Sequence, residues 1–307
     1  MLRLNKILVP QNFTAPAKQA LTQALDLADR VGATVHQVAV DVMYENTYAS
    51  VVSAFSDIDV EEQLREGLDG RKGVEAVIRE ISVDAGILAY AEQQDIDLIV
   101  VGTHGRRGVR RWLLGSVAAD VVRHAPCPVL TVHAREDGAG PAQIPSSILV
   151  PIDFSRHART VLAHAREIAA LYNARLDLLH VIEDILHPSF YHIEVASVYD
   201  LHPDIEETSY AELKAFFEET KGPAVEADFH VTGGNPAQEI VAFAEAHKND
   251  WVVLATHGLR GLEHFLMGSV AEKVVQRVPV PVFTVKSFGK SLLTTPTPEN
   301  TQTMETA

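Results

Sequence analysis

The stretch that decides the fold occurs twice, since Ile7-Leu8-Val9-Pro10-Gln11-Asn12-Phe13-Thr14 returns as Ile148-Leu149-Val150-Pro151-Ile152-Asp153-Phe154-Ser155. In each half an apolar run typical of a buried strand leads into a polar turn, and a helical pattern follows. A second pair of segments matches in the same way: Thr103-His104-Gly105 with Gly115-Ser116, then Thr256-His257-Gly258 with Gly268-Ser269. A repeat this long indicates two copies of one domain joined head to tail.

The apolar face of the first helix keeps its register between the copies. Its members are 141 residues apart in every case: Ala17, Leu21, Ala24 and Ala28 match Ala158, Leu162, Ala165 and Ala169. This spacing places them on one side of a helix. By the second pair of segments the offset has grown to 153, which predicts an insertion of 12 residues in the second copy, between 186 and 204.

Changes in composition mark the ends of the copies. A stretch rich in Gly, Pro and charged residues, 135–143, is typical of a linker, and the Thr- and Pro-rich end of the chain is typical of disorder. We expect a first domain at 1–135, a linker at 136–145, a second domain at 146–287 and a disordered tail at 288–307.

Strand and helix patterns alternate within each copy. The first copy has predicted strands at 6–10, 34–43, 74–81, 97–102 and 128–133, and predicted helices at 15–31, 61–72, 82–93 and 116–124. In the second copy the later strands are predicted at 175–183, 227–231, 251–255 and 281–285. The apolar run Leu98-Ile99-Val100-Val101 is typical of a central parallel strand. We therefore predict an α/β fold of two tandem, doubly wound domains, each with a five-stranded parallel sheet.

Charge and composition exclude several classes of partner. The 307 residues carry a formal net charge of −15, which opposes binding to nucleic acid or anionic membrane. We find no leader-like start and no apolar run near the ~18 residues of a membrane span, so we expect a cytoplasmic protein. Cys127 is the single cysteine, and we interpret it as a small core residue without a redox role.

The pattern richest in chemistry is Gly102-Thr103-His104-Gly105, then nine residues, then Gly115-Ser116, between a buried strand and a helix. Glycines let the backbone approach a ligand, and free amides at a helix N-terminus face an anion. The pattern therefore favours a phosphate site, with an amide and a hydroxyl from Ser116. Four arginines add positive charge in this loop: Arg106, Arg107, Arg110 and Arg111. The alternative is a solvated basic edge.

The ends of the first two strands are expected at the same crevice as Gly102, because ligands of open α/β sheets bind where the strand order switches. A polar side chain at Asn12 suits ribose hydroxyls, and the main chain around Val40 suits an adenine edge. Together these groups predict an adenine-nucleotide site.

Taken together, these motifs resemble the universal stress protein family. The resemblance rests on the Val-Pro-x-Asp-Phe-Ser type of start, the Gly-x-x-Gly-nine-residues-Gly-Ser loop and the Gly-Ser-Val-Ala-x-x-Val-Val-x-x-x-Pro-x-Pro-Val ending, over residues 3–133 and 146–286. It implies a Rossmann-like, adenine nucleotide α hydrolase-like fold. It also implies, for many members, binding of ATP, with Mg²⁺, AMP and ADP as further candidates, whereas other members bind none.

The resemblance also implies which residues line each site. In the first copy they are Pro10, Asn12, Val40, Gly102, Gly105, Gly115, Ser116 and Val117. In the second copy they are Pro151, Asp153, Val181, Ala255, Gly258, Gly268, Ser269 and Val270.

Both copies depart from the family pattern. Asn12 replaces the Asp of nucleotide-binding members, so a charged acceptor for ribose hydroxyls becomes a neutral amide. Ala255 replaces the first glycine, which adds a methyl group near the expected ligand or strains a positive φ. The second loop also has Leu259, Glu263 and His264 where the first has arginines. We therefore expect the first copy to be the better nucleotide site, and the second to be weakened or empty.

The remaining polar candidates are interpreted as structural. His104 and His257 have no acid partner or nucleophile at a fixed spacing, so we expect them to brace their loops. The insertion contains His187, His192 and His202, but their spacing matches no compact zinc pattern, and no metal site is predicted.

Three functions remain open at this point. The first is a stress-response protein in which nucleotide occupancy biases conformation or the binding of an unidentified protein partner. The second is a ligand-free tandem interaction module, favoured by Asn12 and Ala255. A slow ATPase ranks last, because no paired carboxylates or nucleophile–base pair is visible and no catalytic residue is predicted.

The last strand of each copy, at 129–133 and 282–285, is an apolar edge that needs a partner. Universal stress proteins commonly pair through this strand, so the resemblance suggests that the two copies pack as a pseudo-dimer. Two such chains are then expected to form a homodimer.

Overall fold

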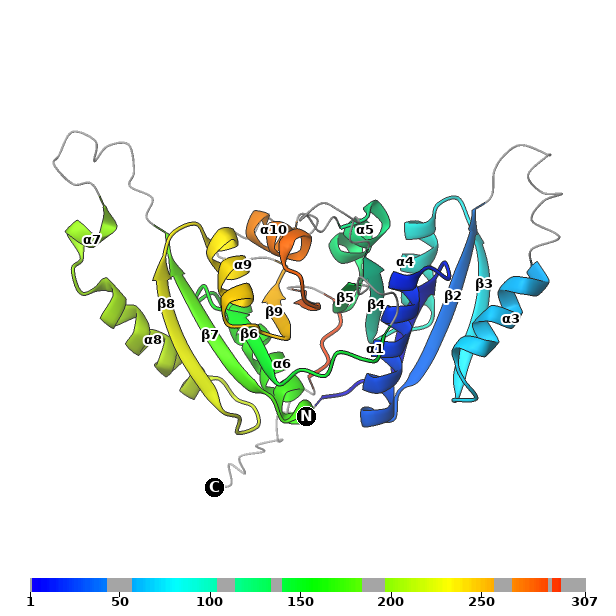
Figure 1. Cartoon of the computed structure of the whole chain (residues 1–307), viewed down its shortest axis with the longest axis horizontal. Helices are drawn as coiled ribbons and strands as arrows, with labels where there is room; N and C mark the ends of the chain where they lie inside the picture. The colour runs from blue at the N-terminus through cyan, green and yellow to red at the C-terminus, as the bar shows by residue number, and fades with distance from the viewer. Residues whose placement is uncertain are drawn as a thin grey trace, which may run out of the picture.

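The computed structural model of the chain describes residues 2–42, 57–103, 114–133, 140–183, 197–256, 267–286 and 289–293. These residues form a sheet of ten strands with helices on both faces (Figure 1). Within the described ranges, every helix is too short or too polar to cross a membrane.

The first copy follows the predicted alternation of strands and helices. Its elements are β1 (Lys6–Gln11), α1 (Ala15–Val31), β2 (Thr34–Val42), α3 (Asp57–Gly67), β3 (Gly73–Glu80), α4 (Val83–Gln93), β4 (Leu98–Thr103), α5 (Ser116–His124) and β5 (Val129–His133). Helix α3 is the exception, because it was predicted at 61–72. It ends early since Asp69 (φ 50°) and Gly70 (φ 74°) turn the chain through the left-handed region.

The second copy repeats this plan, with two helices next to its insertion. Its elements are β6 (Ser147–Pro151), α6 (Arg156–Tyr172), β7 (Arg175–Ile182), α7 (Val198–Leu201), α8 (Ile205–Glu219), β8 (Ala227–Gly233), α9 (Pro236–Ala246), β9 (Trp251–Ala255), α10 (Ser269–Arg277) and β10 (Val282–Val285). The long helices α1 and α6 both stop at a residue in the left-handed conformation, Gly32 and Asn173 respectively.

The strands lie in the order β3-β2-β1-β4-β5-β10-β9-β6-β7-β8. Neighbours within each copy are parallel. In the first copy the chain runs outward from β1 to β3 and then returns to β4 on the other side of β1, and β6 and β9 repeat this switch in the second copy. The predicted doubly wound α/β fold with five strands in each copy is confirmed.

Strands β5 and β10 join the two copies as an antiparallel pair, with Val282 opposite Thr131 and Thr284 opposite Val129. Two side chains strengthen the junction: Thr131 Oγ1 donates to the Val282 carbonyl at 3.4 Å, and Thr284 Oγ1 donates to the Val129 carbonyl at 3.0 Å. The predicted pseudo-dimer is therefore confirmed. Each strand that would be an edge in a single copy becomes an interior strand of the larger sheet.

Helices α1, α3, α6 and α8 cover one face of the sheet, and α4, α5, α9 and α10 cover the other (Figure 1). On the first face one apolar cluster runs through both copies, from Leu27 of α1 past Trp251 of β9 to Phe216 of α8. On the second face each copy has its own cluster. Because part of the core is shared, burial of apolar surface holds the copies together.

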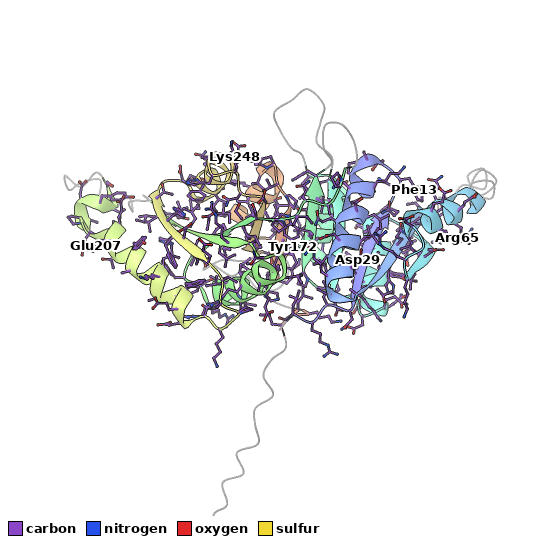
Figure 2. All side chains as sticks on the ribbon, turned by 60° about the horizontal axis from the view of Figure 1, so that its bottom comes forward. Phe13, Asp29, Arg65, Tyr172, Glu207 and Lys248 are labelled. Carbon is purple, nitrogen blue, oxygen red and sulfur yellow. The ribbon has the colours of Figure 1, made fainter. Side chains whose placement is uncertain are left out.

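A polar contact closes the first face where α1 meets α6, near the middle of the molecule (Figure 2). Tyr172 Oη donates to Asp26 Oδ2 at 2.9 Å, and Arg30 Nε lies 3.0 Å from the same oxygen. The Arg30 guanidinium also lies 4.4 Å from the centroid of the Tyr172 ring. Burial and the Asp26 carboxylate raise the pKa of Tyr172, so its phenol remains a donor.

The segment that precedes β6 is packed on the first copy. Of the predicted linker, residues 140–145 lie within the described ranges. Gly140 N donates to Gln19 Oε1 at 2.6 Å, and Gln143 N donates to Gln23 Oε1 at 2.7 Å. Two buried glutamines of α1 therefore hold this part of the linker by its backbone.

The segment that follows β10 corrects the predicted tail. Disorder was expected from 288, but residues 289–293 pack against the first copy, and Leu292 is buried. Lys290 Nζ lies 2.6 Å from Asp97 Oδ1, an ion pair that the composition of the tail alone does not reveal. The prediction was wrong for these five residues, and residues 294–307 lie outside the described part of the chain.

Candidate functional site

The strand order brings most of the predicted site residues of the first copy to one edge of the sheet. Ile7 of β1 pairs with Leu98 of β4, and Pro10 pairs with Val38 of β2, so the carboxyl ends of these three strands open in the same direction. The loops after β1 and β4 lie on either side of the point where the strand order switches. Ligands of open α/β sheets bind at this point.

Several predicted residues of the two glycine loops lie outside the described residues. In the first copy these are His104, Gly105, Arg106, Arg107, Arg110 and Arg111, and in the second they are His257, Gly258, Leu259, Glu263 and His264. What the structure describes is the two ends of each loop, namely the strand that enters it and the helix that leaves it.

The turn after the first strand has the same backbone conformation in both copies. Phe13 has φ 59° and Phe154 has φ 57°, so a non-glycine residue adopts the left-handed conformation twice at equivalent positions. Sequence reasoning missed this feature, although the repeated Phe after Asn or Asp was visible. Such a conformation in a bulky residue is stabilised by its surroundings and is frequent at binding sites.

The polar residue before each Phe organises the turn through one oxygen. Asn12 Oδ1 accepts from Thr14 Oγ1 at 2.7 Å and from Thr14 N at 3.3 Å. Asp153 Oδ1 accepts from Ser155 N at 3.0 Å. The second atom of each side chain then differs, since Asn12 carries an amide donor and Asp153 a carboxylate acceptor.

Gly102 is required by helix α1. A Cβ atom at this position would lie 2.3 Å from the carbonyl carbon and oxygen of Pro16 and 2.7 Å from Ala17 N. Gly102 is absent from the glycines with positive φ, so of the two effects considered for an alanine at this position, backbone strain does not arise and the added methyl group remains. The methyl group of an alanine here would meet the first turn of a helix, so a glycine at position 102 is explained by packing.

Gly115 has no comparable packing role. It is the N-cap of α5 with φ −61° and ψ 155°, a conformation open to any residue, and an added Cβ would meet no heavy atom of the described residues within 4 Å. Ser116 is exposed beside it. The first intrahelical bond runs from Ala119 N to the Gly115 carbonyl, so the amides of the first turn point toward this open space.

Val40 packs its side chain toward α4. It adjoins the apolar cluster of the second face, and a Cβ atom at Gly86 of α4 would lie 2.9 Å from Val40 Cγ1. This packing occupies its side chain, and the use of its main chain by a ligand at the end of β2 stays a prediction.

In the second copy the amide at the start of the corresponding helix, α10, already has a hydrogen-bond partner. Gly268 is the N-cap of α10 with φ −60°, and its amide donates to the Thr256 carbonyl at 2.7 Å, which closes the loop on itself. Ser269 is exposed, as Ser116 is. Beside this crevice, Tyr199 of α7 packs on the end of β8, where a Cβ at Gly233 would lie 2.1 Å from the Tyr199 hydroxyl.

The described ends of the two loops pack across the junction of the copies, through residues that sequence reasoning missed. Leu114 and Met267 each precede the N-cap glycine of their loop, and each packs against the apolar clusters of both copies. Behind them, Arg123 Nη2 of α5 lies 2.8 Å from Glu272 Oε1 of α10. The helices that begin at the two candidate sites therefore lie side by side (Figure 1).

A side chain at the end of each copy's last strand contacts the backbone near the last helix of the other copy. Lys286 Nζ donates to the carbonyls of Val122, in a short contact, and of Arg123 at 2.8 Å, at the end of α5. At the equivalent position His133 lies 2.6 Å from Thr103 Oγ1 and contacts the backbone of Val278, beyond α10. Burial lowers the pKa of Lys286 to about 8 and that of His133 to about 4.

Other candidates for chemistry remain structural in the described residues. Burial raises the pKa of Cys127 to about 12, which makes its thiol unreactive, as its position suggested. Within the ranges that the structure describes, no group of three or more His, Cys, Asp or Glu residues could hold a metal ion. Two of the three insertion histidines, His187 and His192, lie outside those ranges.

Comparison with known proteins identifies the family. The model of the universal stress protein family matches residues 3–133 and 146–286. The chain belongs to the universal stress protein family. The family predicted from the motifs is confirmed, and the two matched ranges coincide with the two copies.

Relatives and solved structures agree with this assignment. A universal stress protein of Mycobacterium tuberculosis is 30% identical over 192 residues, so the match spans 62% of this chain and 62% of the relative. Another from the same organism is 30% identical over 220 residues, 70% of each chain. The crystal structure of a universal stress protein from Archaeoglobus fulgidus has a TM-score of 0.65 at 22% identity and covers 92% of this chain and 98% of that chain, which supports the fold.

Proposed function

We propose that this universal stress protein binds an adenine nucleotide, first of all ATP, in the crevice of its first copy. Occupancy would change its conformation or its affinity for a protein partner. The observation that carries the proposal is the open space at Gly115, which lies at the N-terminus of α5 and has no packing reason to be a glycine. A phosphate group fits such a position, because backbone amides and the helix dipole face it.

The other residues of the crevice match the remaining parts of the ligand. The amides of Ser116 and Val117 would bind phosphate oxygens, and the arginines of the loop add positive charge. Asn12 would donate from Nδ2 to a ribose oxygen, because its Oδ1 is engaged by Thr14. The main chain around Val40 would face the adenine edge. Mg²⁺ would enter together with ATP, and AMP or ADP would bind in place of ATP.

The second copy is proposed as the weaker site. Its Asp153 suits ribose hydroxyls better than Asn12 does. However, the Gly268 amide is already bonded to the Thr256 carbonyl, which removes one donor that a phosphate would use. We infer from this balance that phosphate binding, and with it most of the affinity for ATP, belongs to the first copy.

A second candidate function is a nucleotide-free interaction module. It is favoured by Gly102, whose lack of a side chain is explained by the packing of α1 and needs no ligand. In this case the tandem arrangement would serve only to join the two copies through the shared core and the β5–β10 pair, and the crevice would bind no nucleotide.

Neither candidate includes a chemical step, and we propose no catalytic residue. We also infer a cytoplasmic location and a homodimer of two such chains. Because β5 and β10 already pair within one chain, the homodimer must use another surface, such as the outer strands β3 and β8. A strictly monomeric mass in light scattering would contradict it.

Isothermal titration with Mg-ATP tests the proposal on the wild type and on two matched variants, Gly115→Asp and Gly268→Asp. The open space at Gly115 accommodates the new side chain, so the first variant should fold while its carboxylate repels phosphate. We expect binding to be lost in Gly115→Asp and retained in Gly268→Asp, with unchanged melting temperatures as the control.

The reverse pattern would assign the site to the second copy. Absence of binding by the wild type up to about millimolar ATP, where the binding free energy is only about −4 kcal/mol, would favour the interaction module.

A further inference from the structure

Residues 289–293, which we name the C-terminal clasp, follow β10 of the second copy and contact both copies, through Pro126, Asp97 and Arg3 in the first and His164 of α6 in the second. Lys290 N donates to the Pro126 carbonyl at 2.7 Å, and Arg3 N donates to the Leu292 carbonyl at 2.6 Å. Leu2 and Leu293 form an isolated antiparallel bridge. The clasp therefore spans the junction of the copies on the side opposite the glycine loops, near the N-terminus of the chain (Figure 1).

The clasp has a firm end and an end held by one histidine. At the firm end, Lys290 Nζ lies 2.6 Å from Asp97 Oδ1 and 2.9 Å from Asp95 Oδ1. At the other end, Leu292 is 1% exposed and its amide donates to Nε2 of His164 at 3.3 Å.

The hydrogen bonds of His164 define its neutral tautomer. Its Nδ1 lies 2.7 Å from the Thr160 carbonyl, which can only accept, so Nδ1 carries the proton. Nε2 is then the acceptor for the Leu292 amide, with Ser291 Oγ 3.4 Å away. A second proton on Nε2 would place an N–H group against the Leu292 N–H group, and the hydrogen bond would be lost.

The first copy has a glutamine, Gln23, at the position that matches His164, and the comparison shows what a titratable side chain adds. Gln23 lies 141 residues before His164 on the equivalent helix, and it also binds a backbone amide of a crossing segment, that of Gln143. The amide oxygen of Gln23 does not titrate. The linker that it holds is anchored on both sides by folded copies, whereas the clasp lies beyond the last strand and can detach without disturbing the sheet.

We propose that acid releases the C-terminal clasp from α6 of the second copy, with His164 as the proton-sensing residue, and so loosens the link that the clasp makes between the two copies. At neutral pH the neutral imidazole accepts from Leu292 and the clasp is closed. When the imidazole is protonated, the acceptor is lost, and the clasp opens so that the charged ring reaches water.

The surroundings of His164 favour the neutral form in the closed state. On α6, the Glu167 carboxylate is the charged group that acts on it, and it favours protonation, but it also accepts from Leu2 N at 3.1 Å. From β10 the nearest ring is that of Phe283, and from the clasp itself the neighbours are Ser291 and Leu292, all uncharged. Burial is the larger effect and lowers the pKa of His164.

The sign of the pH dependence follows from these groups. The closed state excludes a proton that the open state binds with an ordinary histidine pKa of about 6.5. The opening equilibrium should therefore be flat above this pH and rise by up to about tenfold for each pH unit below it. Lys290 holds the pKa of Asp95 below its usual value, so this ion pair does not titrate in the same window.

Hydrogen exchange of the Leu292 amide, measured by NMR on the full chain, tests the proposal. Protection factors are compared at pH 7.5 and pH 5.0, so that the intrinsic pH dependence of exchange cancels. We expect protection to fall at least about tenfold in the wild type. In His164→Gln, which copies the first copy, protection should be the same at both pH values.

Two further measurements keep the result decisive. In Lys290→Met, protection should be lower than in the wild type but should keep the same pH dependence, because the ion pair and the histidine act separately. In the wild type, the His164 ring resonances should titrate together with the loss of protection at Leu292. The proposal is overturned if wild-type protection is equal at both pH values, if His164→Gln loses protection as the wild type does, or if His164 stays neutral while the clasp opens.

Discussion

The two candidate crevices have the same backbone plan, but each lacks a different part of the family pattern. The first copy keeps the glycine at 102 and has Asn12, whereas the second keeps Asp153 and has Ala255. The structure separates these substitutions by their physical effect. Gly102 is explained by the packing of Pro16 against it, whereas Asn12 and Asp153 each accept hydrogen bonds that organise the turn, and their contact with a ligand stays a proposal. Loss of a motif residue therefore does not by itself indicate loss of binding.

The largest effect is expected from exchanging the packing residue. Gly102→Ala would place its methyl group 2.3 Å from the Pro16 carbonyl, against backbone that cannot rotate away. We expect the free energy of unfolding to fall by more than about 3 kcal/mol, the upper range for an overpacked core. Urea denaturation measures it. The matched control, Ala255→Gly, should lower stability by about 1 kcal/mol or less, and equal losses would refute the packing explanation.

A second difference between the copies lies at the end of the last strand, where His133 ends β5 and the equivalent Lys286 directly follows β10. Because burial lowers the pKa of His133 to about 4, the unfolded chain binds a proton between pH 6.5 and 4 that the folded chain excludes. Its contribution to stability is complete above pH 6.5 and is lost toward pH 4, by about 3 kcal/mol. Denaturation curves across this range should therefore be less steep in pH for His133→Gln than for the wild type. Identical slopes would contradict the pKa direction.

The smallest effect concerns the ligand. Asn12→Asp restores a carboxylate that accepts from ribose hydroxyls, and charge-assisted hydrogen bonds are roughly twice as strong as neutral ones. We expect the affinity of the first copy for Mg-ATP to rise about fivefold, or about 1 kcal/mol. Titration calorimetry checks this. Weaker binding by Asn12→Asp would mean that the amide of Asn12 makes a specific contact.

Local signals in the sequence were enough for most of the fold. Helix α1 was predicted at its observed bounds, 15–31, and it begins with Pro16 in its first turn and ends before the left-handed Gly32. The start of α4 was predicted within one residue, and Ser82 caps this helix. The end of α3 was missed although the dipeptide Asp69-Gly70, which is typical of a turn, was visible in the sequence, and both residues adopt the left-handed conformation. The repeat itself supplied the two-copy organisation.

The parts that could not be predicted depend on contacts between residues far apart in the chain. Lys290 pairs with Asp97 and Lys286 binds the end of α5, and no spacing rule connects such partners. For the candidate site, the motifs identified the loop ends and the strand-order switch. They did not reveal the positive φ of Phe13 (labelled in Figure 2) or the packing of Leu114 between the two copies.

The pairing of β5 with β10 inside one chain has a consequence for how the interface can change. In a dimer of identical chains, every substitution at a two-fold interface occurs twice, so a histidine and a lysine cannot occupy equivalent positions. Here His133 and Lys286 do so, and the Arg123–Glu272 ion pair has no counterpart, since the equivalent residues are Gln276 and Ala119. Because both copies belong to one chain, a substitution on one side of the interface is not repeated on the other. Each copy can therefore change its interface residues independently, and one copy can take on a role that the other lacks.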